Sequence, residues 1–180
     1  MVKVKSGLLL LLLVPVLLLS QIAAADDYRE YRLGVGDKVK VDIFGHPELS
    51  GDLVVNGGGD VVLPLINAVS AVGLTTHELA ERITWKLKPD YLVNPRVTVE
   101  LLGYRPYYIL GEVNRSGSFP YVEGMTVLNA VALAGGFSDR ANRKKMRIER
   151  KFGEGRKKIK ATPNSKVQPG DIIVIKERFF

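Results

Sequence analysis

The chain has 180 residues, a formal net charge of +7 and no cysteine; 46% of its residues are hydrophobic and 25% are charged. This length fits one or two small domains, and the composition is that of a protein with a buried core, not of a disordered chain. The lack of cysteine excludes disulfides, thiolate metal sites, a cysteine nucleophile and lipidation at an N-terminal cysteine. With only two histidines, a histidine-rich metal site is not expected.

The first 25 residues have the pattern of a secretory signal peptide. Lys3 and Lys5 precede an apolar run at residues 8–19, and three alanines at residues 23–25 provide a cleavage site. We expect cleavage after residue 25 and export of the remaining chain. The alternative is an uncleaved anchor helix, for which the apolar run is short, because a membrane span needs roughly 20 residues.

Residues 26–103 are expected to form a first domain of mixed strands with one helix. Alternating apolar and polar residues predict half-buried strands at residues 39–43 and 97–101. Two further strands, at residues 53–55 and 61–65, flank a loop with three glycines, which permits a tight reversal of the chain.

The helix of this first domain has clear signals at both ends. Thr75 and Glu78 have the spacing of a capping box, and Pro89 ends the helix. The apolar residues between these ends share one helical face: Leu79, Ile83 and Leu87.

Residues 104–180 are expected to form a second domain with a small sheet wrapped on one helix. The predicted strands include residues 107–111 and 172–176, and a short helix covers residues 127–134. Between these two strands, the glycines on either side of residue 154 predict the turn of a β-hairpin. The fold class expected for the chain is therefore α+β, with two small mixed domains.

A Gly-Asp pair occurs before a predicted strand in each domain. Gly36 and Asp37 precede the strand at residues 39–43, and Gly170 and Asp171 precede the last strand. Such turns before strands are common, so we interpret the similarity as shared turn chemistry and not as an internal repeat.

The sequence contains no pattern typical of an active site. His46 lies near Ser50 and Asp42, but no nucleophile-elbow pattern supports a catalytic triad. His77 falls in the first turn of the predicted helix, where a solvated position is expected. The glycine loop lacks the Gly-Lys-Ser/Thr ending of a phosphate-binding loop and does not open a helix. We therefore expect no catalysis, no metal and no cofactor.

Positive charge is concentrated at residues 140–160, which contain eleven Lys or Arg and two Glu. This stretch is either a solvated face of the sheet or an anion-binding surface. Because the chain is expected to be exported, an acidic glycan, phosphorylated lipid headgroups or an acidic protein is a better partner than nucleic acid. The candidate contacts with such an anionic partner are Arg143, Lys144, Lys145, Lys157 and Lys158.

Aromatic residues suggest two further kinds of contact. Phe179 and Phe180 end the sequence, and their exposure to solvent would be unfavourable, so they are candidate assembly contacts with a neighbouring subunit or membrane protein. Four tyrosines either stack on sugars or pack within the sheet, and packing is the more common role: Tyr104, Tyr107, Tyr108 and Tyr121.

Short motifs are spread along both halves of the chain. In the first half they occupy residues 31–37, 45–51, 63–66, 73–75 and 95–99. As a set, they resemble the polysaccharide export domain of bacterial outer-membrane polysaccharide export (OPX) proteins. In the second half they occupy residues 109–113, 117, 126–128 and 134–137, and these resemble the soluble-ligand-binding β-grasp (SLBB) domain that follows it in that family.

The chain also departs from the family pattern. Asn56 and the glycines after it replace an Arg-Pro-Asp-Gly-like turn, Asn67 stands where the family usually has Gly, and Ser116 where it has Pro. The best-known members carry a lipidated N-terminal cysteine and continue past the β-grasp domain into a helix that crosses the outer membrane. This sequence has no cysteine and ends at Phe180, so it resembles the short members of the family.

The resemblance implies a domain order and a function. The domains would be a signal peptide (1–25), a polysaccharide export domain (26–103) and an SLBB domain (104–180). The protein would be a periplasmic, outer-membrane-associated and non-lipidated component of a capsule or exopolysaccharide export channel, without catalysis. Its partners would be copies of itself in a ring, an inner-membrane co-polymerase or synthase, a separate outer-membrane β-barrel protein and the exported polysaccharide. The alternative is a periplasmic glycan- or ligand-binding module.

Overall fold

The computed structural model describes residues 30–153 and 155–178; the predicted signal peptide and both C-terminal phenylalanines, Phe179 and Phe180, lie outside the described residues. From Tyr31 onward the described residues belong to one compact unit that contains two hydrophobic cores. This part of the chain contains two α-helices and three β-sheets, which confirms the predicted α+β class.

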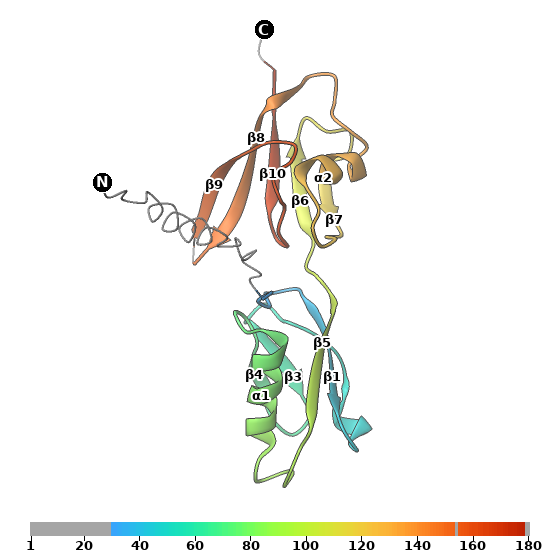
Figure 1. Cartoon of the computed structure of the whole chain (residues 1–180), viewed down its shortest axis with the longest axis vertical. Helices are drawn as coiled ribbons and strands as arrows, with labels where there is room; N and C mark the ends of the chain where they lie inside the picture. The colour runs from blue at the N-terminus through green and yellow to red at the C-terminus, as the bar shows by residue number, and fades with distance from the viewer. Residues whose placement is uncertain (1–29, 154, 179–180) are drawn as a thin grey trace, which may run out of the picture. The chain divides into compact units, whose positions relative to one another are not determined.

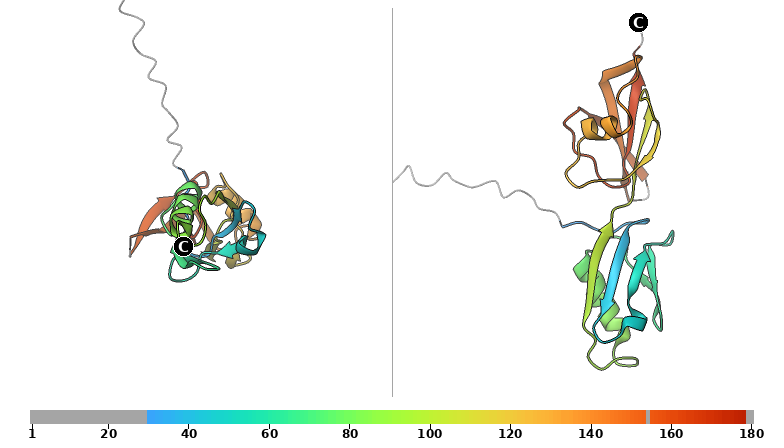
Figure 2. Two further views of the ribbon diagram at one scale, coloured as in Figure 1. Left: turned by 90° about the horizontal axis from the view of Figure 1, so that it is seen from below. Right: turned by 90° about the vertical axis from the view of Figure 1, so that its right-hand side faces the viewer.

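A three-stranded antiparallel sheet forms the centre of the N-terminal part. Its strand order is β2-β1-β5, with β1 at Lys38–Ile43, β2 at Gly51–Val54 and β5 at Val97–Gly103. The short 3-10 helix η1 (Pro47–Leu49) connects β1 to β2. Figure 2 shows β1 between its two neighbours in the right-hand view. Residues in β1 alternate between exposed and buried positions, as the sequence pattern predicts.

Helix α1 (Thr76–Leu87) packs against β5 and is held by the predicted capping box (Figure 1). The Glu78 backbone N–H donates to Thr75 Oγ1 at 3.1 Å, and the Thr75 N–H donates to Glu78 Oε2 at 2.8 Å. The Thr75 N–H, together with Arg32, holds the pKa of the Glu78 carboxyl below its usual value. The predicted apolar face is buried: Leu79, Ile83 and Leu87.

Strand β3 (Asp60–Leu63) pairs with β4 (Asn67–Ser70), which the sequence analysis missed. The two strands around the glycine loop therefore do not pair with each other, because β2 pairs with β1. The expected strand at residues 61–65 ends two residues early, since the chain turns at Leu65 and Asn67, both with positive φ. Asparagine tolerates this backbone conformation better than most residues, which explains how Asn67 replaces the glycine usual in the family.

A five-stranded sheet forms the centre of the C-terminal part. Its order is β7-β6-β10-β8-β9, in which β6 and β10 run parallel and the other neighbours run antiparallel. The structure places these strands as follows: β6 Tyr107–Gly111, β7 Gly117–Phe119, β8 Ala141–Phe152, β9 Gly155–Ala161 and β10 Ile172–Glu177.

Helix α2 (Val127–Leu133) covers one face of this sheet (Figure 1). Thr126 and Asn129 form its capping box, and Gly135 and Gly136, both with positive φ, follow its end. The sheet residues that form the core with α2 include Tyr107, Ile109, Met146, Ile148, Ile173 and Ile175.

Within the described part of the chain, neither helix has the length and apolar character needed to cross a membrane.

Candidate functional site

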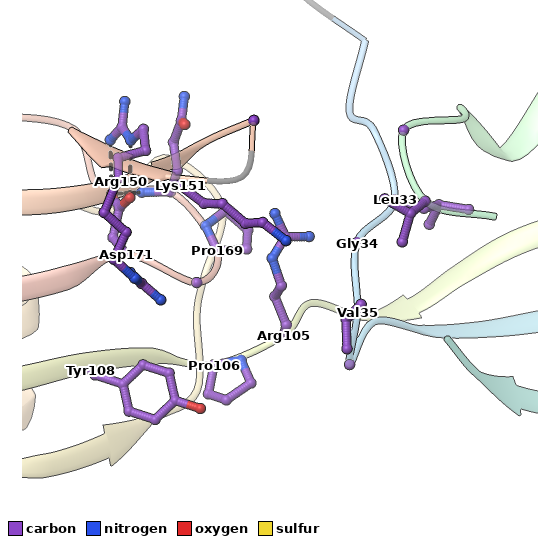
Figure 3. Close-up of a pocket in the computed structure, with 17 residues that line it drawn as sticks. Leu33, Gly34, Val35, Arg105, Pro106, Tyr108, Arg150, Lys151, Pro169 and Asp171 are labelled. Atoms are coloured by element: carbon purple, nitrogen blue, oxygen red, sulfur yellow. Dashed lines mark hydrogen bonds and ion pairs between the residues drawn. The ribbon is translucent and has the colours of Figure 1, made fainter. Parts of the chain in front are cut away.

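A cleft of about 600 Å³ has both Gly-Asp turns in its lining. Figure 3 shows Arg105 in this cleft, between the segment that carries Gly34 and the segment that carries Pro169. Arg150 and Asp171 lie together on the C-terminal side of the cleft.

The Asp37 carboxylate is fully buried and accepts four hydrogen bonds. Its Oδ2 accepts from the Tyr31 hydroxyl at 2.6 Å, from the Gly34 N–H at 2.7 Å and from Arg105 Nη1 at 2.9 Å. Its Oδ1 accepts from the Arg105 backbone N–H at 2.7 Å. Burial, and then the hydrogen bond to Asp37, raise the pKa of Tyr31, so the hydroxyl remains a donor.

The Asp171 carboxylate is 1% exposed and forms a comparable set of contacts within the C-terminal domain. Arg150 binds both of its oxygens, with Nε at 2.9 Å from Oδ1 and Nη2 at 2.7 Å from Oδ2. The Gln168 backbone N–H donates to Oδ2 at 2.8 Å. Both buried carboxylates are thus paired with an arginine and hydrogen-bonded by backbone, the condition under which a charge is tolerated in a protein interior.

Two glycines leave the space that the Arg105 side chain occupies. A Cβ atom at Gly34 would overlap the Arg105 guanidinium, and one at Gly170 would lie 3.0 Å from Arg105 Nε. Arg105 Nη1 also donates to the Tyr31 hydroxyl at 2.7 Å. Arg105 therefore contacts the N-terminal Gly-Asp turn through Asp37 and the C-terminal one through Gly170.

The residues between β5 and β6 are held on both sides. The Tyr104 ring packs edge-to-face on Tyr31 and on Tyr121, with ring centroids 4.9 Å and 5.1 Å apart. The Pro106 carbonyl accepts from the Gly170 N–H at 3.1 Å. We call residues 104–106 the connector.

The sheet face opposite α2 is cationic on one side and apolar on the other. The strand register places Lys160 beside Arg147, Arg147 beside Val174, and Val174 beside Leu110. In the neighbouring set of residues paired across the strands, Lys158 lies beside Glu149, Glu149 beside Ile172, and Ile172 beside Tyr108. We call this surface the outer face; its side chains are exposed or half-buried.

A shallow hollow of about 300 Å³ lies at the cationic side of the outer face, and we call it the basic hollow. It brings together three of the five candidate anion contacts: Lys144, Lys145 and Lys158. It adds three cations that the sequence analysis did not select: Arg147, Lys160 and Lys176.

The two other candidate anion contacts do not line the basic hollow. The Arg143 guanidinium lies over the Phe137 ring at 5.4 Å from its centroid. Lys157 pairs with Arg150 in the ladder and therefore points to the face opposite Lys158. Its ammonium lies over the ring of Phe152, which is 61% exposed.

The histidines do not form a catalytic pair with Ser50. His46 Nδ1 lies 3.0 Å from Glu48 Oε1, whereas Ser50 Oγ accepts from the Ile43 N–H and donates to the His46 carbonyl. His77 is exposed. No group of His, Asp and Glu in the described residues has the arrangement of a metal site.

The four tyrosines have different roles. Tyr107 is fully buried and stacks on Phe119, and its burial raises the pKa of the hydroxyl to about 12. Tyr104 and Tyr121 pack on each other. Tyr108 is 42% exposed, lies on the outer face and also lines the cleft, so it remains available to a ligand.

Sequence reasoning missed Arg105 and Arg150, which complete the two buried ion pairs. The signal that was present is the repeated Gly-Asp pair. Each aspartate of such a pair is expected to be buried in a turn before a strand, and a buried carboxylate needs a cation as its partner. Arginines near the same turns are therefore the candidates for that partner.

Comparison with known proteins places this fold in a family. Residues 25–102 match the model described as polysaccharide biosynthesis/export protein, and residues 106–160 match the SLBB domain. The chain thus contains a polysaccharide export domain followed by an SLBB domain. The family resemblance found in the sequence is thereby confirmed.

The relatives with known roles are longer than this chain. The exopolysaccharide production protein ExoF of Rhizobium meliloti is 38% identical over 129 residues, which is 65% of this chain and 30% of ExoF. The polysialic acid transport protein KpsD of Escherichia coli is 31% identical over 109 residues, 59% of this chain and 20% of KpsD. The EPS I polysaccharide export outer membrane protein EpsA of Ralstonia solanacearum is 29% identical over 134 residues, 60% of this chain and 35% of EpsA. The matched region is thus about a third or less of each relative.

Proposed function

We propose that this protein is a periplasmic component of a system that exports polysaccharide to the cell surface, and that it performs no chemistry itself. The observation that carries the proposal is the presence of both family domains in the family's order. The relatives named for exopolysaccharide production, polysialic acid transport and EPS I export support it.

The proposed protein is made with a signal peptide that is cleaved after residue 25, and it acts next to the outer membrane without a lipid anchor. Its mature part comprises the polysaccharide export domain (26–103) and the SLBB domain (104–180). Its partners are an inner-membrane co-polymerase or synthase, the polymer and a separate outer-membrane protein.

The proposed assembly is a ring of identical subunits. A ring repeats one heterologous interface, so each subunit presents a surface and its complement. On α1, Trp85 is 83% exposed and lies between two hollows, one next to Leu74 and one next to Val97. An exposed tryptophan beside hollows is typical of interface centres, where Trp is enriched.

The decisive experiment measures polysaccharide in a strain that lacks this protein. We expect loss of extracellular polymer with retention in the periplasm, and restoration by the intact chain. Normal export in that strain, in a genome without a second copy, would contradict the proposal. Electron microscopy of the purified protein with its outer-membrane partner then tests the ring, and particles that remain monomeric would contradict it.

A monomeric glycan-binding module is the second candidate, and the exposed Tyr108, which lies on the outer face and lines the cleft, favours it. It predicts saturable binding of an oligosaccharide by the monomer together with unchanged export in the deletion strain. The deletion experiment therefore separates the two candidates.

A further inference from the structure

The positive charge of this protein is unevenly distributed between its domains. Residues 104–180 contain sixteen Lys or Arg and seven Asp or Glu, whereas residues 31–103 contain seven and nine. The excess is therefore a property of the SLBB part of the chain, and its cations gather at the β8–β9 hairpin.

The lysines of the basic hollow have no acidic partners within the described residues. Arg147 pairs with Glu149 at 2.9 Å, but none of the hollow's lysines forms an ion pair in this part of the chain. Like charges held together repel, and a bound polyanion relieves this repulsion. The hollow is thus suited to several negative groups and not to one. Its lysines are Lys144, Lys145, Lys158, Lys160 and Lys176.

The cationic positions continue along the hairpin toward the cleft. One side of β8 carries Arg147, Glu149 and Lys151. In the strand pairing, these three residues lie opposite Lys160, Lys158 and Arg156 of β9, in that order. Lys151, Arg156 and Tyr108 then line the cleft. From Lys145 to Lys151 the strand extends over ~20 Å at ~3.3 Å per residue, a length that suits a chain-like ligand better than a single small anion.

The apolar side of the outer face lies next to these cations. Leu110 is exposed, Tyr108 is half-exposed, and Val174 and Ile172 are half-buried between them and the basic strands. Aromatic and aliphatic side chains pack against the C–H faces of sugar rings, while lysines pair with carboxylates. A single polysaccharide chain that contains sugar acids would contact both the apolar side and the cationic side of the outer face.

Two other anionic partners fit the surface less well. A folded protein partner usually contacts roughly 20–30 residues on each side, whereas eight residues line the basic hollow. A membrane contacts protruding groups, whereas these lysines line a depression.

We propose that the outer face of the SLBB sheet binds an extended carboxylate-bearing polysaccharide, with its acid groups in the basic hollow and its sugar rings on Tyr108 and Leu110. This rests on the proposed export function and deepens it, because it assigns an acidic class to the polymer. The bound chain follows the β8–β9 hairpin toward the cleft.

The test uses isothermal titration calorimetry on the protein purified from the periplasm, with oligogalacturonate as the acidic probe and a maltooligosaccharide of equal length as the neutral one. We expect saturable binding of oligogalacturonate that weakens as salt rises, and at least tenfold weaker binding of the maltooligosaccharide. The triple variant Lys158→Gln/Lys160→Gln/Lys176→Gln should weaken oligogalacturonate binding by tenfold or more.

A charge-matched control carries Lys38→Gln, Lys40→Gln and Lys88→Gln, three exposed lysines of the other domain. We expect it to bind oligogalacturonate within twofold of the unmodified protein. Tyr108→Ser should weaken binding about threefold without changing the salt dependence. Circular dichroism checks that all three variants are folded.

Three results would overturn the inference: no binding of oligogalacturonate, equal losses in the two triple variants, or binding to phosphatidylglycerol vesicles without binding to the acidic oligosaccharide. Expressing the hollow variant in the deletion strain separates the two proposals. If the intact chain restores export and the hollow variant does so equally, the inference fails while the export function stands. If deletion leaves export unchanged, the export function fails, and the calorimetry still decides whether an acidic glycan binds.

Discussion

In the turn before β1 and in the turn before β10, a glycine with positive φ precedes a buried aspartate. The φ angles are 93° at Gly36 and 82° at Gly170. The backbone N–H of each aspartate donates at 3.1 Å to the carbonyl three residues earlier. Each carboxylate accepts from the N–H of that same earlier residue, at 2.7 Å for Asp37 and 2.8 Å for Asp171.

The two turns differ in the origin of their arginine. Arg105, which pairs with Asp37, belongs to the connector, whereas Arg150, which pairs with Asp171, belongs to β8 of the same sheet. The same kind of turn therefore stabilises the link between the two domains at Asp37 and stabilises a single sheet at Asp171. The element that supplies the cation decides what a buried Gly-Asp turn stabilises.

The largest expected effect comes from removing either carboxylate charge. Asp37→Asn and Asp171→Asn should each lower the free energy of unfolding by about 3 kcal/mol, because each leaves a largely buried arginine without its partner. In either variant the new amide NH₂ faces a donor, since both oxygens of each carboxylate accept hydrogen bonds. Urea unfolding measures the change.

The control for these two variants is Asp52→Asn, at an exposed position. It should change the free energy of unfolding by less than about 0.5 kcal/mol. Losses below 1 kcal/mol in both buried variants would show that the ion pairs are not the main contribution of these turns.

Replacing arginine by lysine sharpens the comparison. Arg150 binds both oxygens of Asp171, whereas the Arg105 side chain reaches Asp37 through one nitrogen and its backbone N–H provides another bond. Lysine cannot reproduce a two-pronged contact. We expect Arg150→Lys to cost about 2 kcal/mol and Arg105→Lys about 1 kcal/mol in urea unfolding, from the lost charge-assisted bonds. The reverse order would contradict the assignment of the two contacts.

Gly170 and Gly73 separate backbone strain from contact with Arg105. Both have a φ of 82°, but a Cβ atom meets Arg105 only at Gly170. Gly73→Ala and Gly170→Ala should each cost about 1 kcal/mol for the left-handed backbone, and Gly170→Ala should cost a further few tenths. That excess should vanish when Arg105→Ala is added, because coupled sites deviate from additivity; an unchanged excess would argue against the contact.

Tyr31 supplies a donor that has no counterpart at Asp171. Tyr31→Phe should cost about 1 kcal/mol, the contribution of one hydrogen bond to a buried acceptor. Because the pKa of Tyr31 is raised in the folded protein, its contribution is complete below the ordinary tyrosine pKa of about 10 and is lost as pH rises above it.

Chemical unfolding between pH 8 and pH 11 tests this pH dependence. The unmodified protein should lose more stability across that interval than Tyr31→Phe does. The raised pKa of Tyr107 contributes a residual loss in both proteins. Parallel curves would show that the Tyr31 hydroxyl is not coupled to folding.

Much of the fold could be predicted because its signals are local. The capping box at Thr75 and the alternation in β1 depend on residues that are neighbours in the chain. Strand β4 was missed because it is short and only Val69 in it is buried, which leaves no alternation to detect. Its position depends on the turn at Leu65 and Asn67, where no glycine marked the positive φ.

The candidate site was less accessible to sequence reasoning. The basic stretch predicted where the cations would be, but Lys157 and Lys158 separate to opposite faces of β9, which only the strand register determines. Lys176 joins the basic hollow from a different strand. Asp37 and Arg105 are 68 residues apart, and no spacing rule connects them.

The connector, residues 104–106, is restrained along its whole length. Each of its residues is held: Tyr104 by two aromatic rings, Arg105 by Asp37, and Pro106 by the Gly170 N–H. We expect these contacts to resist bending between the two domains. In an assembly of many copies, this resistance would limit how far each subunit bends, and inserting a few flexible residues into the connector would remove it.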